Sequence, residues 1–200
     1  MVLLRSFSQL KFGGFTMNKG TAIGIVETSS IAKGFEVADT ILKAANVDIM
    51  LNRTVCPGKY IVLVTGDVDA VQSSVQAGVN IGAHTVVDQF IIPNVHSAIF
   101  PAISGMEHVP ELKALGVIEG FSVASVVEAA DAAIKAAPIQ FVNIHLAMAI
   151  GGKGFVSFTG DVAAVEEATQ VGAAVIEKRG LLVEKIVIPR PRQEIVREFV

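Results

Sequence analysis

Two apolar runs separated by a tight turn make up the stretch Val47-Asp-Ile-Met-Leu-Asn-Arg-Thr-Val-Cys-Pro-Gly-Lys-Tyr-Ile-Val-Leu-Val-Thr-Gly-Asp67. Both runs are rich in β-branched residues and the Cys-Pro-Gly between them is a turn sequence, so we expect a hairpin of strands 47–55 and 60–65. Cys56 in this turn is the only cysteine of the chain. It cannot form an intrachain disulfide, nor complete an iron–sulfur or zinc site, which needs three or four ligands. It contributes to such a site only if symmetry brings several copies of the turn together.

The composition favours a chain that assembles. Hydrophobic residues make up 52% of the 200 residues, against an average of about 45–50% that also counts glycine. We therefore expect large subunit contacts, and the length suits two domains of about 90–100 residues each. A net charge of −3 without a basic run argues against a nucleic-acid partner. The single cysteine is typical of a reducing compartment, and the uncharged stretches are too short and too interrupted to cross a membrane.

An internal repeat is the strongest signal in the sequence. Residues 24–45 match residues 116–137 at ten of 22 positions with a constant shift of 92. Residues 58–78 match residues 152–172 at 11 of 21 positions with a shift of 94, and Ile92-Pro93 falls on Ile188-Pro189 at a shift of 96. The growing shift indicates two short insertions in the second copy, which we expect in loops.

Each copy predicts the same six elements. In the first copy, strand 21–27 precedes a helix over 30–45, and the hairpin precedes a second helix over 68–82 and a closing strand over 86–92. Asp67 is expected to cap the second helix with its carboxylate. The first helix places an apolar face on one side: Ile31, Phe35, Ala38, Ile41, Leu42 and Ala45. The fold class is thus α+β, with two tandem ferredoxin-like domains in the order strand-helix-strand-strand-helix-strand.

The repeat divides the chain into three parts. We expect an N-terminal extension over residues 1–18, a first domain over 19–108 and a second over 109–200, with a linker from about Asn94 to Leu115 that contains Pro101, Gly105 and Pro110. Residues 1–16 are basic and mildly amphipathic but lack a secretory signal pattern. They fit a transit peptide or a docking helix, or else a leader ahead of Met17.

The repeated residues resemble a known family. Gly24-Ile-Val-Glu-Thr-Ser-Ser-Ile-Ala-Lys-Gly-Phe-Glu-Val-Ala-Asp-Thr-Ile-Leu-Lys-Ala-Ala-Asn-Val47, Thr65-Gly-Asp-Val-Asp-Ala-Val71 and Val187-Ile-Pro-Arg-Pro191 are similar to bacterial microcompartment (BMC) shell proteins. The resemblance covers nearly all of residues 21–196, twice over, and implies the tandem-domain subclass. In that subclass three chains form a ring that resembles a six-fold tile, placed in the microcompartment shell within the cytoplasm. The element order does not indicate the permuted subclass.

Within the subclass, the turn Thr54-Val-Cys-Pro-Gly-Lys-Tyr60 resembles the central turn of tandem shell proteins from propanediol-utilisation compartments. The resemblance implies that Cys56 is a metal ligand, and that one such cysteine from each of three subunits holds a [4Fe-4S] cluster at the tile centre. The alternative is a small buried hydrophobic side chain, the usual role of a lone cysteine. Further residues are expected in the central turns or around the pore: Pro57, Gly58, Lys59, Gly151, Gly152 and Lys153.

The resemblance also implies contacts at the tile edge. Lys43 and Lys135 match the family's edge lysine, and Arg190 matches its edge arginine, whereas Asn94 stands at that place in copy one. A lysine on a polar helix face is otherwise simply solvated. Lys59 and Lys153 either set a positive potential at the central turns or are ordinary solvated side chains. The histidines lack ligand spacing, and the sequences around them indicate ordinary polar positions, with His84 at a helix end: His84, His96, His108 and His145.

The expected function is that of a structural shell protein and not an enzyme, since no catalytic constellation or phosphate-binding loop is present in the sequence. The resemblance implies a homotrimer that tiles with other shell proteins and passes electrons or iron through its cluster, with a lumenal or cytosolic redox partner. Two alternatives stay open. One is a tile without a cluster whose central pore admits small metabolites, and the other is a soluble, metabolite-binding regulatory protein.

Overall fold

Both copies of the repeat fold into the predicted order of strands and helices. The structure, a computed structural model, describes residues 9–12, 15–18, 22–105, 112–146 and 150–196. It divides into two compact units. Unit 1 comprises the residues up to Thr54 together with Tyr60–Asn94, and unit 2 comprises Val55–Lys59 together with the residues from Val95 onward. The turn that contains Cys56 therefore belongs to unit 2.

Unit 1 is built on a four-stranded sheet in the order β4-β5-β3-β6, which is the ferredoxin-like order. Its elements are β3 (Ala22–Thr28), α1 (Ile31–Ala44), β4 (Asp48–Val55), β5 (Lys59–Gly66), α2 (Val68–Gly82), the short 3₁₀ helix η1 (Ala83–Thr85) and β6 (Val86–Ile92). The central strand β3 pairs antiparallel with both β5 and β6. Buried side chains of this sheet and of α1 and α2, such as Val26, Ile41 and Val75, form the core.

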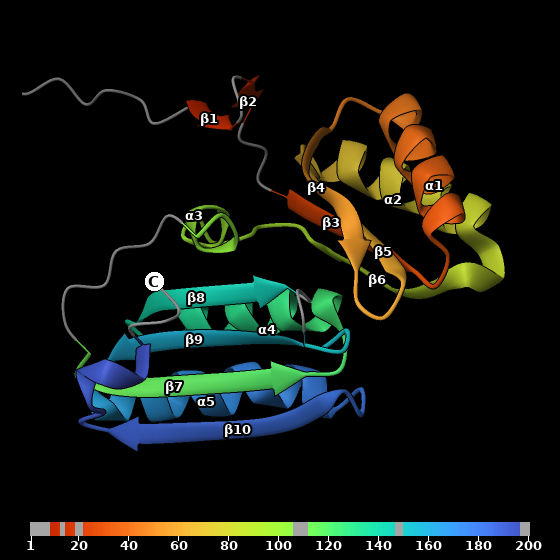
Figure 1. Cartoon of the computed structure of the whole chain (residues 1–200). Coiled ribbons are helices and arrows are strands. Elements are labelled where there is room, and N and C mark those ends of the chain that lie inside the picture. Colours follow the sequence, from red (N-terminus) through yellow and green to blue (C-terminus); the bar gives the residue numbers. More distant parts are fainter. Residues whose placement is uncertain (1–8, 13–14, 19–21, 106–111, 147–149, 197–200) are drawn as a thin grey trace, which may run out of the picture. The chain divides into compact units, whose positions relative to one another are not determined.

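Unit 2 repeats this arrangement in the order β8-β9-β7-β10. Its elements are α3 (Ile99–Ile103), β7 (Ala114–Gly120), α4 (Val123–Ala136), β8 (Gln140–Leu146), β9 (Gly154–Gly160), α5 (Val162–Glu177), β10 (Leu182–Pro189) and the 3₁₀ helix η2 (Gln193–Val196). Figure 1 shows α4 and α5 together on one face of the sheet, as two helices of a two-layer α+β fold must be to bury their apolar faces. The two insertions of this copy fall in the turn between β8 and β9 and in the connection between α5 and β10, as expected.

The helices begin at or next to the predicted residues, but not every N-cap side chain makes a capping hydrogen bond. Ser30 accepts a hydrogen bond from the Lys33 amide at 3.3 Å, and Ser122 does the same for the Ser125 amide. Asp67 occupies the N-cap of α2, yet its side chain makes no capping hydrogen bond. The expectation that the Asp67 carboxylate caps this helix is therefore wrong, although the helix begins where it was predicted.

The apolar face predicted for the first helix is partly wrong. Ala38 and Ile41 are buried as expected, together with Gly34 and Val37, but three of the predicted residues are exposed: Ile31 at 39%, Phe35 at 60% and Leu42 at 46%. The reason is close packing at two glycines. A Cβ atom at Gly34 would lie 2.4 Å from Tyr60 Cβ on β5, and one at Gly78 on α2 would lie 2.7 Å from Ile41 Cγ1. These contacts turn the Gly34 and Ile41 side of α1 toward the core.

The predicted linker contains a helix. Residues Ile99–Ile103 form α3, in which Ile99, Phe100 and Ala102 are buried. Pro101 was placed in a linker, but it lies in the first turn of α3, where a missing N–H costs nothing because no intrahelical acceptor exists for it. At the other end of the chain, residues 9–12 and 15–18 form the strands β1 (Gln9–Phe12) and β2 (Phe15–Asn18). The docking-helix hypothesis is thus wrong for these residues, and the rest of the extension lies outside the described residues.

Candidate functional site

The Cys56 turn closes the hairpin between β4 and β5. Cys56 is exposed, and so are Pro57 and Gly58. Gly58 has φ of +90°, a left-handed conformation that glycine adopts freely, and its amide donates to the Val55 carbonyl at 3.1 Å. This tight closure leaves the Cys56 thiol at the tip of the hairpin. The alternative of a buried, packed cysteine is therefore wrong for the single chain.

The turn of the second copy lies against the Cys56 turn within unit 2. A Cβ atom built on Gly152 would lie 2.5 Å from the Cys56 carbonyl oxygen and 2.9 Å from Pro57 Cδ. Such distances are too short for any side chain, so only glycine permits this approach. Gly151 beside it also has a left-handed φ, of +67°, but a Cβ there would meet nothing within 4 Å. The structure thus brings together the central-turn residues of both copies.

The two turn lysines are engaged with neighbours. Lys153 forms an ion pair with Glu119 on β7, so its charge is largely compensated locally. A Cβ on Gly152 would lie 3.1 Å from Lys59 Cε, which places the Lys59 side chain beside the glycine turn. Because Lys153 is paired, its interpretation as a source of positive potential is weakened, whereas for Lys59 that interpretation stays a prediction. Sequence reasoning missed Glu119, although its match with Glu27 in the repeat was visible.

One chain supplies a single thiol to this site. Among the described residues, no group of three or more His, Cys, Asp and Glu side chains could hold a metal ion. An iron–sulfur cluster needs several thiolates around it. An exposed thiol at a hairpin tip fits such a cluster only as one ligand of several, and the others would have to come from further copies of the chain.

The residues predicted for the tile edge lie on helices and at a strand end. Lys43 on α1 forms an exposed ion pair with Asp39, at 2.6 Å. Lys135 on α4 pairs with Asp131 at 2.5 Å, but here the Asp131 side chain is only 8% exposed. Arg190 directly follows β10 with φ of +49°, and its amide donates to the Lys113 carbonyl at 3.0 Å. None of the three lies in the Cys56 turn, and their role at an edge stays a prediction.

The histidines that the structure describes occupy polar positions. His96 Nδ1 accepts a hydrogen bond from the Ala98 amide at 3.3 Å, and the His145 ring stacks on Phe155 with centroids 5.2 Å apart. His84 lies in η1, which directly follows α2. His108 lies outside the described residues.

Tyr60, which directly follows the turn, was not singled out by the sequence. Its ring packs on Phe35 with centroids 4.9 Å apart and lies over Gly34. Burial raises the pKa of the Tyr60 phenol, and a hydrogen bond with Asn52 opposes part of that shift. Burial also lowers the pKa of Arg53 on the neighbouring strand β4. The sequence signal for this contact is Gly34, one turn into α1, together with Tyr60, the only aromatic residue of β5.

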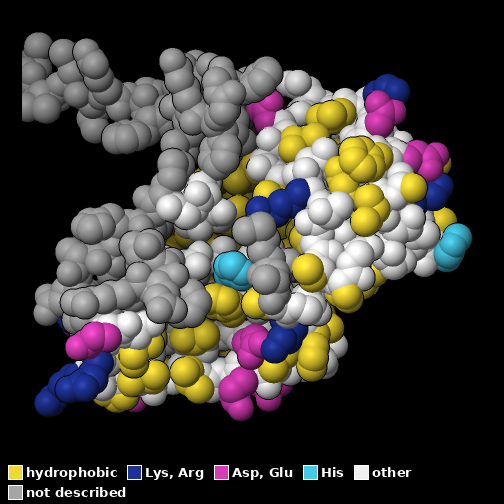
Figure 2. Space-filling view, viewed as in Figure 1, with side chains coloured by type: hydrophobic (Ala, Val, Ile, Leu, Met, Phe, Trp, Pro, Cys, Tyr) yellow, Lys and Arg dark blue, Asp and Glu magenta, His cyan; other side chains and the backbone are white. Residues whose placement is uncertain are grey.

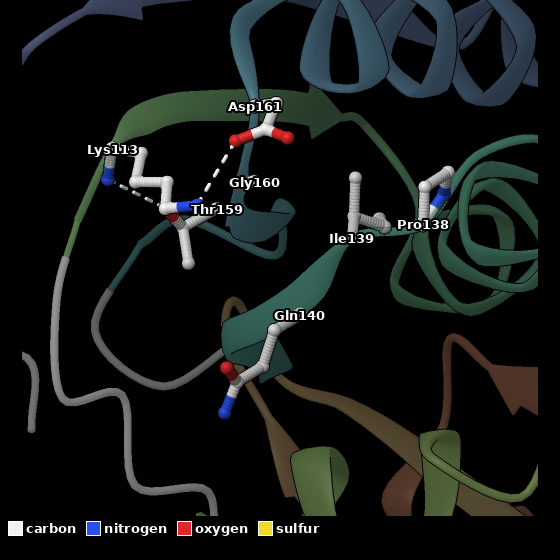
Figure 3. A pocket seen from close by; sticks show the side chains of 7 residues that line it. All are labelled: Lys113, Pro138, Ile139, Gln140, Thr159, Gly160 and Asp161. Atoms are coloured by element: carbon white, nitrogen blue, oxygen red, sulfur yellow. Dashed lines mark hydrogen bonds and ion pairs between the residues drawn. The ribbon is translucent and has the colours of Figure 1, made fainter.

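A pocket of about 380 Å³ opens at the far end of β9 from the glycine turn (Figure 3). Its lining consists of Lys113, Pro138, Ile139, Gln140, Thr159, Gly160 and Asp161. Lys113 Nζ lies 3.1 Å from Asp161 Oδ1 across the opening, so the two charges satisfy each other. The Thr159 hydroxyl accepts from the Lys113 amide and donates to the Ala114 carbonyl. The polar groups of the pocket thus serve the fold, and the pocket does not single out a ligand.

No helix in the described part of the chain is long and apolar enough to span a membrane.

Comparison with known proteins matches both copies of the repeat to one family, described as the BMC domain, over residues 22–95 and 114–191. The bacterial microcompartment shell protein PduT of Citrobacter freundii is 42% identical over 179 residues, which cover 90% of this chain and 97% of PduT. The shell protein EutM of Salmonella typhimurium is 39% identical over 88 residues, 44% of this chain and 90% of EutM. A crystal structure of a microcompartment protein from Desulfitobacterium hafniense has a TM-score of 0.82 and 52% identity, covering 88% of this chain and 98% of that one.

Proposed function

The chain belongs to the BMC-domain family of bacterial microcompartment shell proteins, and we propose that three copies of it form a tile with one [4Fe-4S] cluster at its centre. It is a structural protein of the microcompartment shell, within the cytoplasm. What is proposed beyond this is the trimer, the cluster, and the passage of electrons or iron that a cluster would permit.

The number of domains supports the trimer. A single-domain relative such as EutM corresponds to less than half of this chain, and the BMC domain occurs twice in it. Three chains therefore supply six such domains, enough for a ring with pseudo-six-fold symmetry. A contact in which one surface of a chain binds a different surface of the next copy gives a ring when the rotation between copies closes.

The observation that carries the cluster is the exposed thiol of Cys56 at the tip of the β4–β5 hairpin, held next to the glycine turn of the second copy. A cysteine with only a packing role is normally buried. Around a three-fold axis, three such turns would present three thiolates to one centre. A [4Fe-4S] cluster bound there would have one iron without a cysteine ligand, open to a small ligand, and would supply one-electron chemistry or exchangeable iron.

The residues around Cys56 suit a positioning role. The close approach of Gly152 fixes the backbone of the Cys56 turn, and the Lys153 pair with Glu119 ties the glycine turn to β7. Both contacts restrict where the thiol can move. No step of chemistry on a substrate is assigned to this chain, and we propose that it is not an enzyme.

A tile without a cluster is the second candidate. In it the Cys56 and Gly151 turns would line a central pore for small metabolites, as the exposure of Cys56, Pro57, Gly58 and Gly151 permits. The comparisons favour either tile over a soluble regulatory protein, because the relatives named above are shell proteins. Partners would be other shell proteins and, with a cluster, a redox protein of the lumen or cytosol.

The test separates the tile from its cluster. Sedimentation velocity of the full chain should give a trimer, and mixing with a single-domain shell protein should give joint sheets. The Cys56→Ser variant, prepared without oxygen beside the parent, should keep the trimer and lose the iron. Iron retained by the variant would contradict the assignment of Cys56, and a monomer that never joins sheets would contradict the tile.

A further inference from the structure

One face of the first helix of each repeat is buried in copy two and exposed in copy one. On α4 this face consists of Val123, Ala124, Val127 and Asp131, all of them buried. The matching face of α1, which we call the outer face, consists of Ile31, Ala32, Phe35 and Asp39, all of them exposed. Val127 is 0% exposed and its counterpart Phe35 is 60% exposed. Figure 2 shows hydrophobic side chains at the surface of unit 1 in the region of α1.

Within unit 2, the segment that precedes the second domain lies against the buried face of α4. The His96 amide donates to Asp131 Oδ1 at 2.7 Å, so the carboxylate binds the backbone of this segment. The helix α3 that follows packs against α4 and β8. Its apolar side chains Ile99 and Phe100 are 0% and 6% exposed. Residues that directly follow copy one in the chain therefore pack against α4 at the Asp131 end of its buried face.

The residues that follow copy two repeat this covering segment. At the shift of 96, Pro93 falls on Pro189, His96 on Arg192 and Ile99 on Ile195. The segment 191–195 also enters a short helix, η2, as its counterpart enters α3. Yet Ile195 is 48% exposed, whereas Ile99 is fully buried. Arg192, Glu194 and Ile195 of this segment are exposed, whereas Pro191 is buried. A covering segment with three exposed residues and a face of the kind it covers are thus present on the same chain.

We propose that residues 192–195 of one chain bind the outer face of α1 of a neighbouring copy. The Arg192 amide would donate to the Asp39 carboxylate, as the His96 amide does to Asp131, and Ile195 would pack beside Phe35. Charge complementarity supports this occupant, because Arg192 adds a positive charge where Asp39 offers a negative one. Each chain would bind its neighbour through residues 192–195 and would bind the next chain through its own outer face. Two different surfaces therefore meet in every contact, which is the type of contact that can close a ring. The inference rests on the proposed tile and names the surface that closes it.

A disulfide tests this contact directly. In a Cys56→Ser background, Asp39→Cys combined with Arg192→Cys should form disulfides between chains on mild oxidation, giving covalent dimers and trimers on non-reducing gels. The matching pair inside the chain, His96→Cys with Asp131→Cys, is the positive control and should form a disulfide within one chain. The 2.7 Å bond from the His96 amide to the Asp131 carboxylate shows that the two residues are close neighbours, as a disulfide requires. Each single-cysteine variant in the same background is the negative control.

The possible results lead to different conclusions. Linkage between peptides 31–43 and 191–196 of different chains, identified by mass spectrometry, supports the contact. A trimer in which the two cysteines stay unlinked, or link only within a chain, overturns this inference and leaves the tile intact. A chain that is monomeric at all concentrations overturns both. Independently, Ile195→Asp should raise the dissociation constant of the trimer about tenfold or more, and an unchanged constant would contradict the role of Ile195.

Discussion

A methyl group at Gly152 should displace the Cys56 turn, whereas one at Gly151 should not. Both glycines have left-handed φ, +83° and +67°, so alanine at either position carries a backbone cost of about 1–2 kcal/mol. At Gly152 the new Cβ would also meet the Cys56 carbonyl oxygen at 2.5 Å and Pro57 Cδ at 2.9 Å. Relief of such overpacking typically costs about 1–3 kcal/mol more. We therefore expect Gly152→Ala to lower the free energy of unfolding by about 2–5 kcal/mol, and Gly151→Ala by about 1–2 kcal/mol.

The assay has two readouts on the protein without iron. Denaturant unfolding measures the free energy, and the rate of Cys56 alkylation by iodoacetamide measures whether the thiol has moved. Gly152→Ala should change both, while Gly151→Ala should alkylate like the parent. Equal destabilisation and equal alkylation rates in the two variants would show that the close approach of Gly152 to Cys56 neither stabilises the protein nor positions the thiol. The reasoning about how this thiol is positioned would then be wrong.

Three further predictions concern unit 1. Gly34→Val should be strongly destabilising, because the valine side chain would enter the space of the Tyr60 ring. Adding Tyr60→Gly recreates the pair of residues found in copy two and should recover part of the lost free energy of unfolding in a double-mutant cycle. Additive losses would contradict this packing. Burial raises the pKa of Tyr60, the only tyrosine of the chain, above the unfolded value of about 10. The contribution of Tyr60 to stability is therefore complete below about pH 10 and is lost as the pH rises through the folded pKa. Spectrophotometric titration of the tyrosine should give a midpoint that is higher in the folded protein than in the unfolded chain. An equal midpoint in both states would refute the burial of Tyr60. Ser30→Ala should lower the free energy of unfolding by about 1 kcal/mol, because the Ser30 hydroxyl caps α1 by accepting from the Lys33 amide. Asp67→Ala should lower it by less, because Asp67 makes no capping bond. Thermal unfolding that shows the larger loss for Asp67→Ala would contradict this.

The order of strands and helices was accessible from the sequence, because each element carries its own period and the repeat gives every element twice. The position of the Cys56 turn was accessible for the same reason. Apolar periodicity alone could not identify the buried face of α1, because this helix carries two apolar stripes. Val37 is buried and Phe35 exposed because of the contact between Gly34 and Tyr60. These two residues are distant in sequence and meet only in the folded unit.

The contacts that hold the central turns were beyond sequence reasoning. Glu27 and Glu119 match in the repeat, but the Lys153 partner of Glu119 follows only from the register of β7 with β9. The helix α3 was missed because Pro101, Gly105 and Pro110 together indicated a linker, although proline fits the first turn of a helix. Exposure of the outer face of α1 became visible only when the two copies could be compared in three dimensions.

The central claim is that three Cys56 thiolates share one cluster. The most direct test is the ultraviolet–visible and electron paramagnetic resonance spectrum, with iron and sulfide content, of the full chain reconstituted without oxygen. The account predicts a charge-transfer band near ~400 nm, typical of thiolate-bound iron–sulfur clusters, with about four iron and four sulfide per three chains, absent from Cys56→Ser. A colourless trimer after the same reconstitution would contradict the claim and leave a tile without a cluster.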